Sequence, residues 1–171
     1  MNNWKMKALN EDKAEIYIYS DIGYDWWEDK SSAEELNALG DVKYIDLHIN
    51  SNGGDVFDGQ AIHSLIRHNK AYVTAYVDGL AASIATVIAM GADKVVMPRN
   101  AMMMIHNAWT GMYGNANDLR KMADDLDHIN DSIVNTYLAK AKDKTKEEEK
   151  DNANNNSSNS TTSSNHSTVA P

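Results

Sequence analysis

The chain of 171 residues contains no cysteine. This absence excludes disulfide bonds, thiolate zinc sites and a cysteine nucleophile, and it is typical of a reducing compartment such as the cytoplasm. Long apolar runs are also missing: the longest weakly polar stretch, residues 79–92, is too short to span a bilayer, and the start, MNNWKMKALNED, has no signal-peptide core. We therefore expect a cytoplasmic protein without a membrane partner.

The chain also lacks a surplus of positive charge. Lys and Arg number 16 against 25 Asp and Glu, and the formal net charge is -9. Proteins that bind nucleic acids by charge carry a basic surface, so we expect no nucleic-acid partner. Polypeptides and small molecules stay open as partners.

What the sequence does contain is an alternation of strand-like and helix-like segments. Alternating or continuous apolar residues predict strands over residues 15–20, 44–50, 71–77, 94–97 and 102–105. Helical periodicity and caps predict helices over residues 31–39, 56–68 and 82–90. Repeated βα units imply right-handed crossovers, so we predict an α/β fold with a mainly parallel sheet and functional loops at the carboxyl ends of its strands.

One long amphipathic helix is predicted from residue 115 to 142. Its apolar residues recur every three or four positions: Leu119, Met122, Leu126, Ile129, Ile133 and Tyr137. A helix of this length is expected to project beyond a small domain and to offer its apolar stripe to another subunit. Packing of the stripe against its own domain explains the pattern equally well.

The composition changes near the end of the chain. Residues 151–171 contain 15 Asn, Ser or Thr among 21 and hardly any apolar side chain. Such a segment cannot bury enough surface to offset the loss of chain entropy on folding. We therefore predict one folded domain over residues 1–150 and a disordered tail over residues 151–171.

A candidate nucleophile and base lie in the middle of the chain. Ser83 sits between small residues at the start of an apolar helix in DGLAASIATVIAMG, and His106 ends the apolar run MMMI. Small neighbours allow a tight strand-to-helix turn that exposes the hydroxyl, and the spacing leaves room for one strand before the histidine. The pair suggests a serine hydrolase, although a serine in an alanine-rich helix more often caps or packs.

Two backbone amides are candidates for an oxyanion hole. The Ile84 N–H would lie at the start of a helix, where unsatisfied donors and partial positive charge collect. The turn Ser51-Asn52-Gly53-Gly54 follows a strand, and Gly54 is the preferred second donor because paired glycines allow close approach to a substrate. A glycine pair after a strand is, however, most often only a turn.

No metal site is expected from the histidines. His48, His63, His68 and His128 lack the short paired spacing with carboxylates that metal sites show. We therefore predict neither a metal nor another cofactor.

Three segments together resemble a known family. INSNGGDVFDG, DGLAASIATVIAMG and MMMIHNAWTG resemble the proteolytic subunit of Clp protease, particularly its phage and prophage-encoded relatives, and the similarity spans residues 15–142. The resemblance implies a Clp/crotonase-type fold of stacked βαβ units, with the long helix as the handle through which homo-oligomeric rings stack. It also implies that Ser83 and His106 are catalytic, with Gly54 and Ile84 in the oxyanion hole.

The resemblance further implies a polypeptide substrate. Cellular members of the family degrade unfolded polypeptides beside an ATP-driven unfoldase, which would be a partner, whereas phage relatives cut scaffold or head proteins. The aromatic-rich start IYIYSDIGYDWW favours the phage type. We therefore expect a serine endopeptidase of Clp type that acts on head or scaffold proteins.

The chain departs from the family pattern at two places. Asn52 stands where the family usually has proline, and the third catalytic residue, an aspartate beyond the long helix, has no confident match in KEEEKDNANNNSSNS. Asp151 is the nearest acid and only a weak candidate. An alternative function is therefore a catalytically impaired ring or scaffold subunit. A crotonase-like acyl-CoA enzyme is less favoured because of the pairing of Ser83 with His106.

Overall fold

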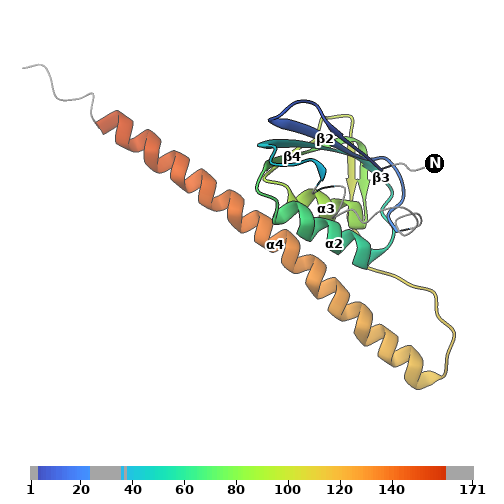
Figure 1. Cartoon of the computed structure of the whole chain (residues 1–171). Helices are drawn as coiled ribbons and strands as arrows, with labels where there is room; N and C mark the ends of the chain where they lie inside the picture. The colour runs from blue at the N-terminus through green and yellow to red at the C-terminus, as the bar shows by residue number, and fades with distance from the viewer. Residues whose placement is uncertain (1–3, 24–35, 37, 161–171) are drawn as a thin grey trace, which may run out of the picture.

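A mixed sheet with helices stacked on one face forms the body of the protein (Figure 1). The computed structural model describes residues 4–23, 36 and 38–160, with side chains up to residue 143 and at 145. The strands are β1 (Trp4–Ala8), β2 (Lys13–Ile18), β3 (Tyr44–Ser51), β4 (Tyr72–Ala82), β5 (Lys94–Val96) and β6 (Met102–Met104). The helices are α2 (Val56–Arg67), α3 (Ile84–Gly91) and α4 (Ala116–Ser160).

The sheet is parallel except at one edge. Its order is β1-β2-β3-β4-β5, with β6 paired to β4, and the only antiparallel pair among the described strands is β1 with β2. The predicted α/β fold with a mainly parallel sheet is thus confirmed. β4 pairs with β5 at residues 74–76 and with β6 at residues 80–82. The segment that follows β6 therefore begins beside the carboxyl end of β4.

The hydrophobic core lies between the sheet and the helices α2 and α3. Every second residue of β2, β3 and the first half of β4 is buried, as in Ile16, Leu47 and Val77, while α3 is buried along almost its whole length. Figure 1 shows both helices on the same face of the sheet. Burial of one such side chain contributes about 1.5–3 kcal/mol. The short, apolar α3 is thereby held rigidly at the end of β4.

The start of α2 depends on a side-chain cap. Asp55 accepts hydrogen bonds from the N–H groups of Phe57 (2.8 Å) and Asp58 (3.0 Å). We expect Asp55→Ala to lower the free energy of unfolding by about 1 kcal/mol, because these two donors lose their partner. Asp55→Asn should retain most of the stability. Chemical denaturation measures both, and an unchanged midpoint for Asp55→Ala would contradict the capping role.

The long helix α4 crosses α2 and α3 with its middle part and projects at both ends (Figure 1). Arg67 of α2 forms an ion pair with Asp143 (2.6 Å), and the Lys140 ammonium donates to the carbonyl groups of Ala92 (2.5 Å) and Asp93 (2.7 Å). These contacts fix the middle of the helix to the domain.

The apolar stripe of α4 is covered only in part. Ile133 and Tyr137 pack against the core cluster, whereas Leu119 and Leu138 are about half exposed. Packing against its own domain is thus confirmed for part of the stripe. Contact of the remainder with another subunit stays a prediction.

Several expected boundaries differ from the observed ones. The strand predicted over 71–77 continues to Ala82, so residue 82 ends a strand instead of beginning a helix, and β1 was not predicted at all. Most of the helix expected over 31–39 lies outside the described residues. None of the described helices is long and apolar enough to cross a membrane.

The long helix ends later than its predicted bound, residue 142. α4 continues to Ser160, while residues 161–171 lie outside the described part, and disorder of residues 151–171 stays a prediction. Once a helix is nucleated, each further residue adds a backbone hydrogen bond, so Asn and Ser can prolong it despite weak propensity.

Candidate active site

Ser83 lies on a sharp turn between β4 and α3. Its backbone angles are φ 55° and ψ -129°, and it is the only residue other than glycine with positive φ in the described part of the chain. Such a conformation costs about 1–3 kcal/mol and persists only where the surroundings enforce it. Ser83 occupies the N-cap position of α3 but makes no capping hydrogen bond. The hydroxyl is therefore presented as on a nucleophile elbow, not used as a helix cap.

His106 is brought to the same turn by the pairing of β6 with β4. The Ser83 N–H donates to the Met104 carbonyl (2.8 Å), and the Nε2 of His106 lies 2.7 Å from the Ser83 Oγ. This is hydrogen-bond distance for a base and its nucleophile. The Nδ1 of His106 has no hydrogen-bond partner within the described residues.

Of the two predicted oxyanion donors, Ile84 directly follows Ser83, and Gly54 follows Gly53, whose Cβ position lies 2.6 Å from the Ser83 Cβ. Ile84 is the first residue of α3, and Gly54 follows the end of β3. In that turn the Gly53 N–H donates to the Ser51 Oγ (3.1 Å), while neither the Gly54 N–H nor the Ile84 N–H has a hydrogen-bond partner within the part that the structure describes. Both amides are therefore available to a ligand, and the Ile84 amide lies at the positive end of a helix.

The comparison with known proteins identifies a family. The model of the family described as Clp protease matches residues 7–165. The chain belongs to the Clp protease family. Its fold and the order of its motifs are those expected from the resemblance.

Individual relatives support the family at moderate identity. The ATP-dependent Clp protease proteolytic subunit of Deinococcus radiodurans is 35% identical over 105 residues, which cover 60% of this chain and 51% of that protein. The subunit of the same name from Leuconostoc citreum is 37% identical over 117 residues, covering 66% of this chain and 58% of that protein. The chain thus spans a little over half the length of these relatives.

The turn after β3 leaves no room for a Cβ at either glycine, at Gly53 because of the elbow and at Gly54 because of Ile22. A Cβ on Gly53 (φ 98°) would lie 2.6 Å from the Ser83 Cβ and 2.8 Å from the Ala82 carbonyl oxygen. A Cβ on Gly54 (φ 147°) would lie 2.0 Å from the Ile22 carbonyl oxygen. Sequence reasoning selected Gly54 and missed the contact of Gly53 with Ser83, for which the glycine pair was the only signal.

Two asparagines add contacts around this Clp-type site. Asn52, where the family usually has proline, donates from its side-chain amide to Asp21 (3.2 Å). Asn130 of α4 accepts a hydrogen bond from the Ala108 N–H (2.8 Å) and so holds the segment that follows His106. The sequence did not reveal Asn130, because the contact joins residues 22 positions apart across two elements.

Asp151, the weak candidate for a third acid, lies on α4, and its side chain is outside the described ones. Its assignment gains no support.

A group of possible metal ligands lies elsewhere, on the sheet face opposite the helices. Ligand atoms of Glu15, Asp46 and His48 lie within 4.8 Å of one another. Asp46 already pairs with the Lys13 ammonium (2.6 Å), and the Nδ1 of His48 lies 2.8 Å from Asp78. Sequence spacing missed this grouping because the residues meet across strands. Glu15 accepts a hydrogen bond from the Tyr17 hydroxyl (3.0 Å), and acidic groups of this kind are common without an ion, so the grouping does not by itself indicate a metal.

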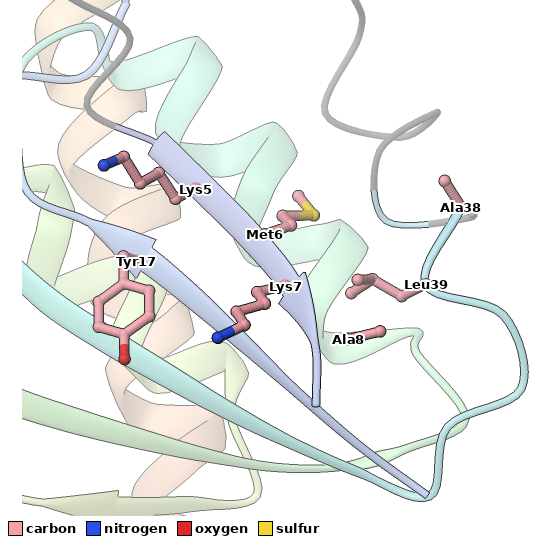
Figure 2. Close-up of a pocket in the computed structure, with 7 residues that line it drawn as sticks. All are labelled: Lys5, Met6, Lys7, Ala8, Tyr17, Ala38 and Leu39. Carbon is pink, nitrogen blue, oxygen red and sulfur yellow. The ribbon is translucent and has the colours of Figure 1, made fainter. Parts of the chain in front are cut away.

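One pocket of 660 Å³ lies at the edge strand β1, away from the motifs of the family. Its lining residues are Lys5, Met6, Lys7, Ala8, Tyr17, Ala38 and Leu39. Figure 2 shows that Met6 and Leu39 lie on one side of β1 while Lys7 and Tyr17 lie on the other. The pocket contains no residue of the candidate active site.

Proposed function

We propose that this chain is a serine endopeptidase that uses Ser83 and His106. The observation that carries the proposal is the distance of 2.7 Å between the Ser83 Oγ and the His106 Nε2, with Ser83 on a strained elbow. His106 takes the proton of the hydroxyl as the oxygen attacks a peptide carbonyl. The protonated imidazole then passes that proton to the leaving amine, and water hydrolyses the acyl-enzyme after activation by the same histidine.

The developing negative charge falls on the former carbonyl oxygen. The N–H groups of Gly54 and Ile84 supply the stabilisation, since both lack partners in the described part of the chain, Ile84 directly follows the nucleophile and Gly54 follows Gly53, which approaches it. Backbone donors of this kind cost no reorganisation during the reaction, and loss of one typically reduces turnover by about 10²–10³-fold.

The finer parts of the proposal concern substrate and assembly. The relatives named above are called ATP-dependent proteolytic subunits. We extend this to a polypeptide substrate, a homo-oligomeric ring and an unfoldase ATPase partner for this chain. The half-exposed residues of α4 support a contact between subunits. The phage role, cutting of head or scaffold proteins, is carried by the segment IYIYSDIGYDWW, part of which lies outside the described residues.

A second candidate is a ring or scaffold subunit with impaired catalysis. It is favoured by the Nδ1 of His106, for which the described residues supply no carboxylate partner. In a catalytic triad this partner holds the imidazole in the correct tautomer, and its loss costs about 10⁴-fold in turnover.

Covalent labelling by a fluorophosphonate probe distinguishes these two candidates. We expect the folded wild type to gain one probe mass, read by intact mass spectrometry at neutral pH, and Ser83→Ala to gain none, because the phosphonyl group is captured by an activated serine. Ser64→Ala is a matched control, since Ser64 lies on α2 and donates to the Gln60 carbonyl (2.9 Å). Absence of labelling in the folded wild type would favour the impaired subunit. Labelling retained by Ser83→Ala would remove Ser83 as nucleophile.

A further inference from the structure

We propose that Tyr137 of α4 positions the oxyanion donor Ile84 N–H, acting through the hydroxyl of Thr86. This inference rests on the function proposed above. It assigns a positioning role to a residue of the long helix whose hydroxyl is hydrogen-bonded to Thr86 and, within the described residues, to neither the Ser83 hydroxyl nor His106. Three observations carry it: the hydrogen bonds around the Ser83 carbonyl, the burial of Thr86, and the planarity of the Ser83–Ile84 peptide.

The carbonyl oxygen of Ser83 is held by a single neighbouring residue. It accepts a hydrogen bond from the Thr86 N–H (3.0 Å) and a second from the Thr86 Oγ1 (2.5 Å). The Thr86 hydroxyl also forms a short hydrogen bond with the Tyr137 hydroxyl. A chain of three groups thus runs from α4 to the elbow.

The direction of this chain follows from counting protons. A hydroxyl has one proton to donate. Because Thr86 gives its proton to the Ser83 carbonyl, Tyr137 must be the donor to the Thr86 Oγ1. Burial raises the pKa of Tyr137 above its ordinary value, so its hydroxyl stays protonated near neutral pH. The resulting order is Tyr137 O–H to Thr86 O–H to Ser83 C=O.

The Ser83 carbonyl and the Ile84 N–H belong to one rigid group. A trans peptide is planar, and its C=O and N–H point in opposite directions. Thr86 is fully buried and holds the oxygen on the core side of the elbow. The Ile84 N–H therefore points away from Thr86, toward the open side. Fixing the carbonyl fixes the oxyanion donor.

The strain at Ser83 makes this support necessary. With φ 55° and ψ -129° the residue lies in a conformation that non-glycine residues rarely adopt. It persists only where neighbouring contacts over-determine it. The two hydrogen bonds from Thr86 constrain the rotation of the peptide that follows Ser83, and Tyr137 in turn holds the Thr86 hydroxyl. Without this chain we expect the Ile84 N–H to sample other directions.

The test compares variants by the kinetics of fluorophosphonate labelling. Thr86→Val removes the hydroxyl at nearly constant shape, Tyr137→Phe removes only the terminal oxygen, and Thr86→Ser keeps the relay. We expect Thr86→Val and Tyr137→Phe to reduce the maximal labelling rate by about tenfold. This effect is smaller than the loss of about 10²–10³-fold found when an oxyanion donor is removed outright. The probe concentration at half-maximal rate should change less than about twofold, because the donor acts in the transition state. Thr86→Ser should label like the wild type.

The control variant is Tyr113→Phe, since Tyr113 is fully exposed and lies far from the relay in the sequence. Thermal melting of each variant shows whether the labelled protein is folded. If Thr86→Val does not fold, Tyr137→Phe carries the test. A reactive wild type whose folded relay variants label equally fast overturns this inference alone. A folded wild type that does not label overturns the proposed activity and this inference with it.

Discussion

Replacement of His106 by alanine is expected to reduce the rate of fluorophosphonate labelling by about 10³-fold or more. The Nε2 of His106 is 2.7 Å from the Ser83 Oγ, and no other base bonds to that oxygen within the described residues. A serine hydroxyl is a weak nucleophile without its base, and general bases contribute about 10²–10⁴-fold. Labelling rates of wild type and variant at matched probe concentration measure the effect.

A control variant and a chemical rescue show whether the effect is specific to the His106 imidazole. His128→Ala should label like the wild type, because His128 is an exposed residue of α4. Added imidazole should partly restore labelling of His106→Ala, since the side chain of His106 is exposed and its replacement leaves the site open to a small base. A His106→Ala variant that labels within about tenfold of the wild type would show that another group activates Ser83.

The second large effect is expected at Gly53. Alanine there must adopt φ 98° and place its Cβ 2.6 Å from the Ser83 Cβ. Backbone strain and overpacking each cost about 1–3 kcal/mol, so we expect the free energy of unfolding to fall by about 2–4 kcal/mol. Labelling of Ser83 should fall by about 10²-fold or more, because the shift displaces the nucleophile and the adjacent donor together. Chemical denaturation and labelling kinetics measure the two effects.

Two other glycines allow the effect of backbone strain at Gly53 to be distinguished from the effect of close approach to Ser83. Gly40 has φ 74° and open space around its Cβ position, so Gly40→Ala measures backbone strain alone, about 1 kcal/mol. Gly111 has open space and no positive φ, so Gly111→Ala should leave stability nearly unchanged and keep labelling at the wild-type rate. If Gly53→Ala behaves like Gly40→Ala in both measurements, close approach to Ser83 is not what requires glycine at that position.

The fold was predictable wherever one face of an element is buried. Strands β2 and β3 and helix α2 were predicted within about two residues of their bounds, because alternation or helical periodicity directly records which side chains face the core. The strand β1 was missed although Trp4, Met6 and Ala8 alternate with two lysines, because a run of five residues is short and this one lies at the sheet edge. The last residues of β4 were missed because they are extended by pairing with β6, a contact that no local pattern records.

The candidate site was predictable in its members but not in its geometry. Ser83, His106, Gly54 and Ile84 were all named from spacing and resemblance, and in the structure Ser83 lies within hydrogen-bond distance of His106 and directly before Ile84. Their catalytic roles stay predictions until labelling is measured. Gly53, Asn130 and the pair of Thr86 and Tyr137 were not foreseen. Each acts through a contact between elements distant in the chain, which depends on how α4 and the turn after β3 pack.

The sequence by itself determined the fold class, the family, and the residue types able to carry nucleophile, base and oxyanion donors. These follow from side-chain chemistry and from hydrophobic periodicities, which can be recognised in the sequence without knowing which elements pack together. Only the tertiary structure decided that the His106 Nε2 lies 2.7 Å from the Ser83 Oγ, and that the Ser83 carbonyl is held from α4. Hydrogen bonds require positions within a few tenths of an ångström. Such positions are set by the register of β6 on β4 and by the docking of α4, which are properties of the packed chain.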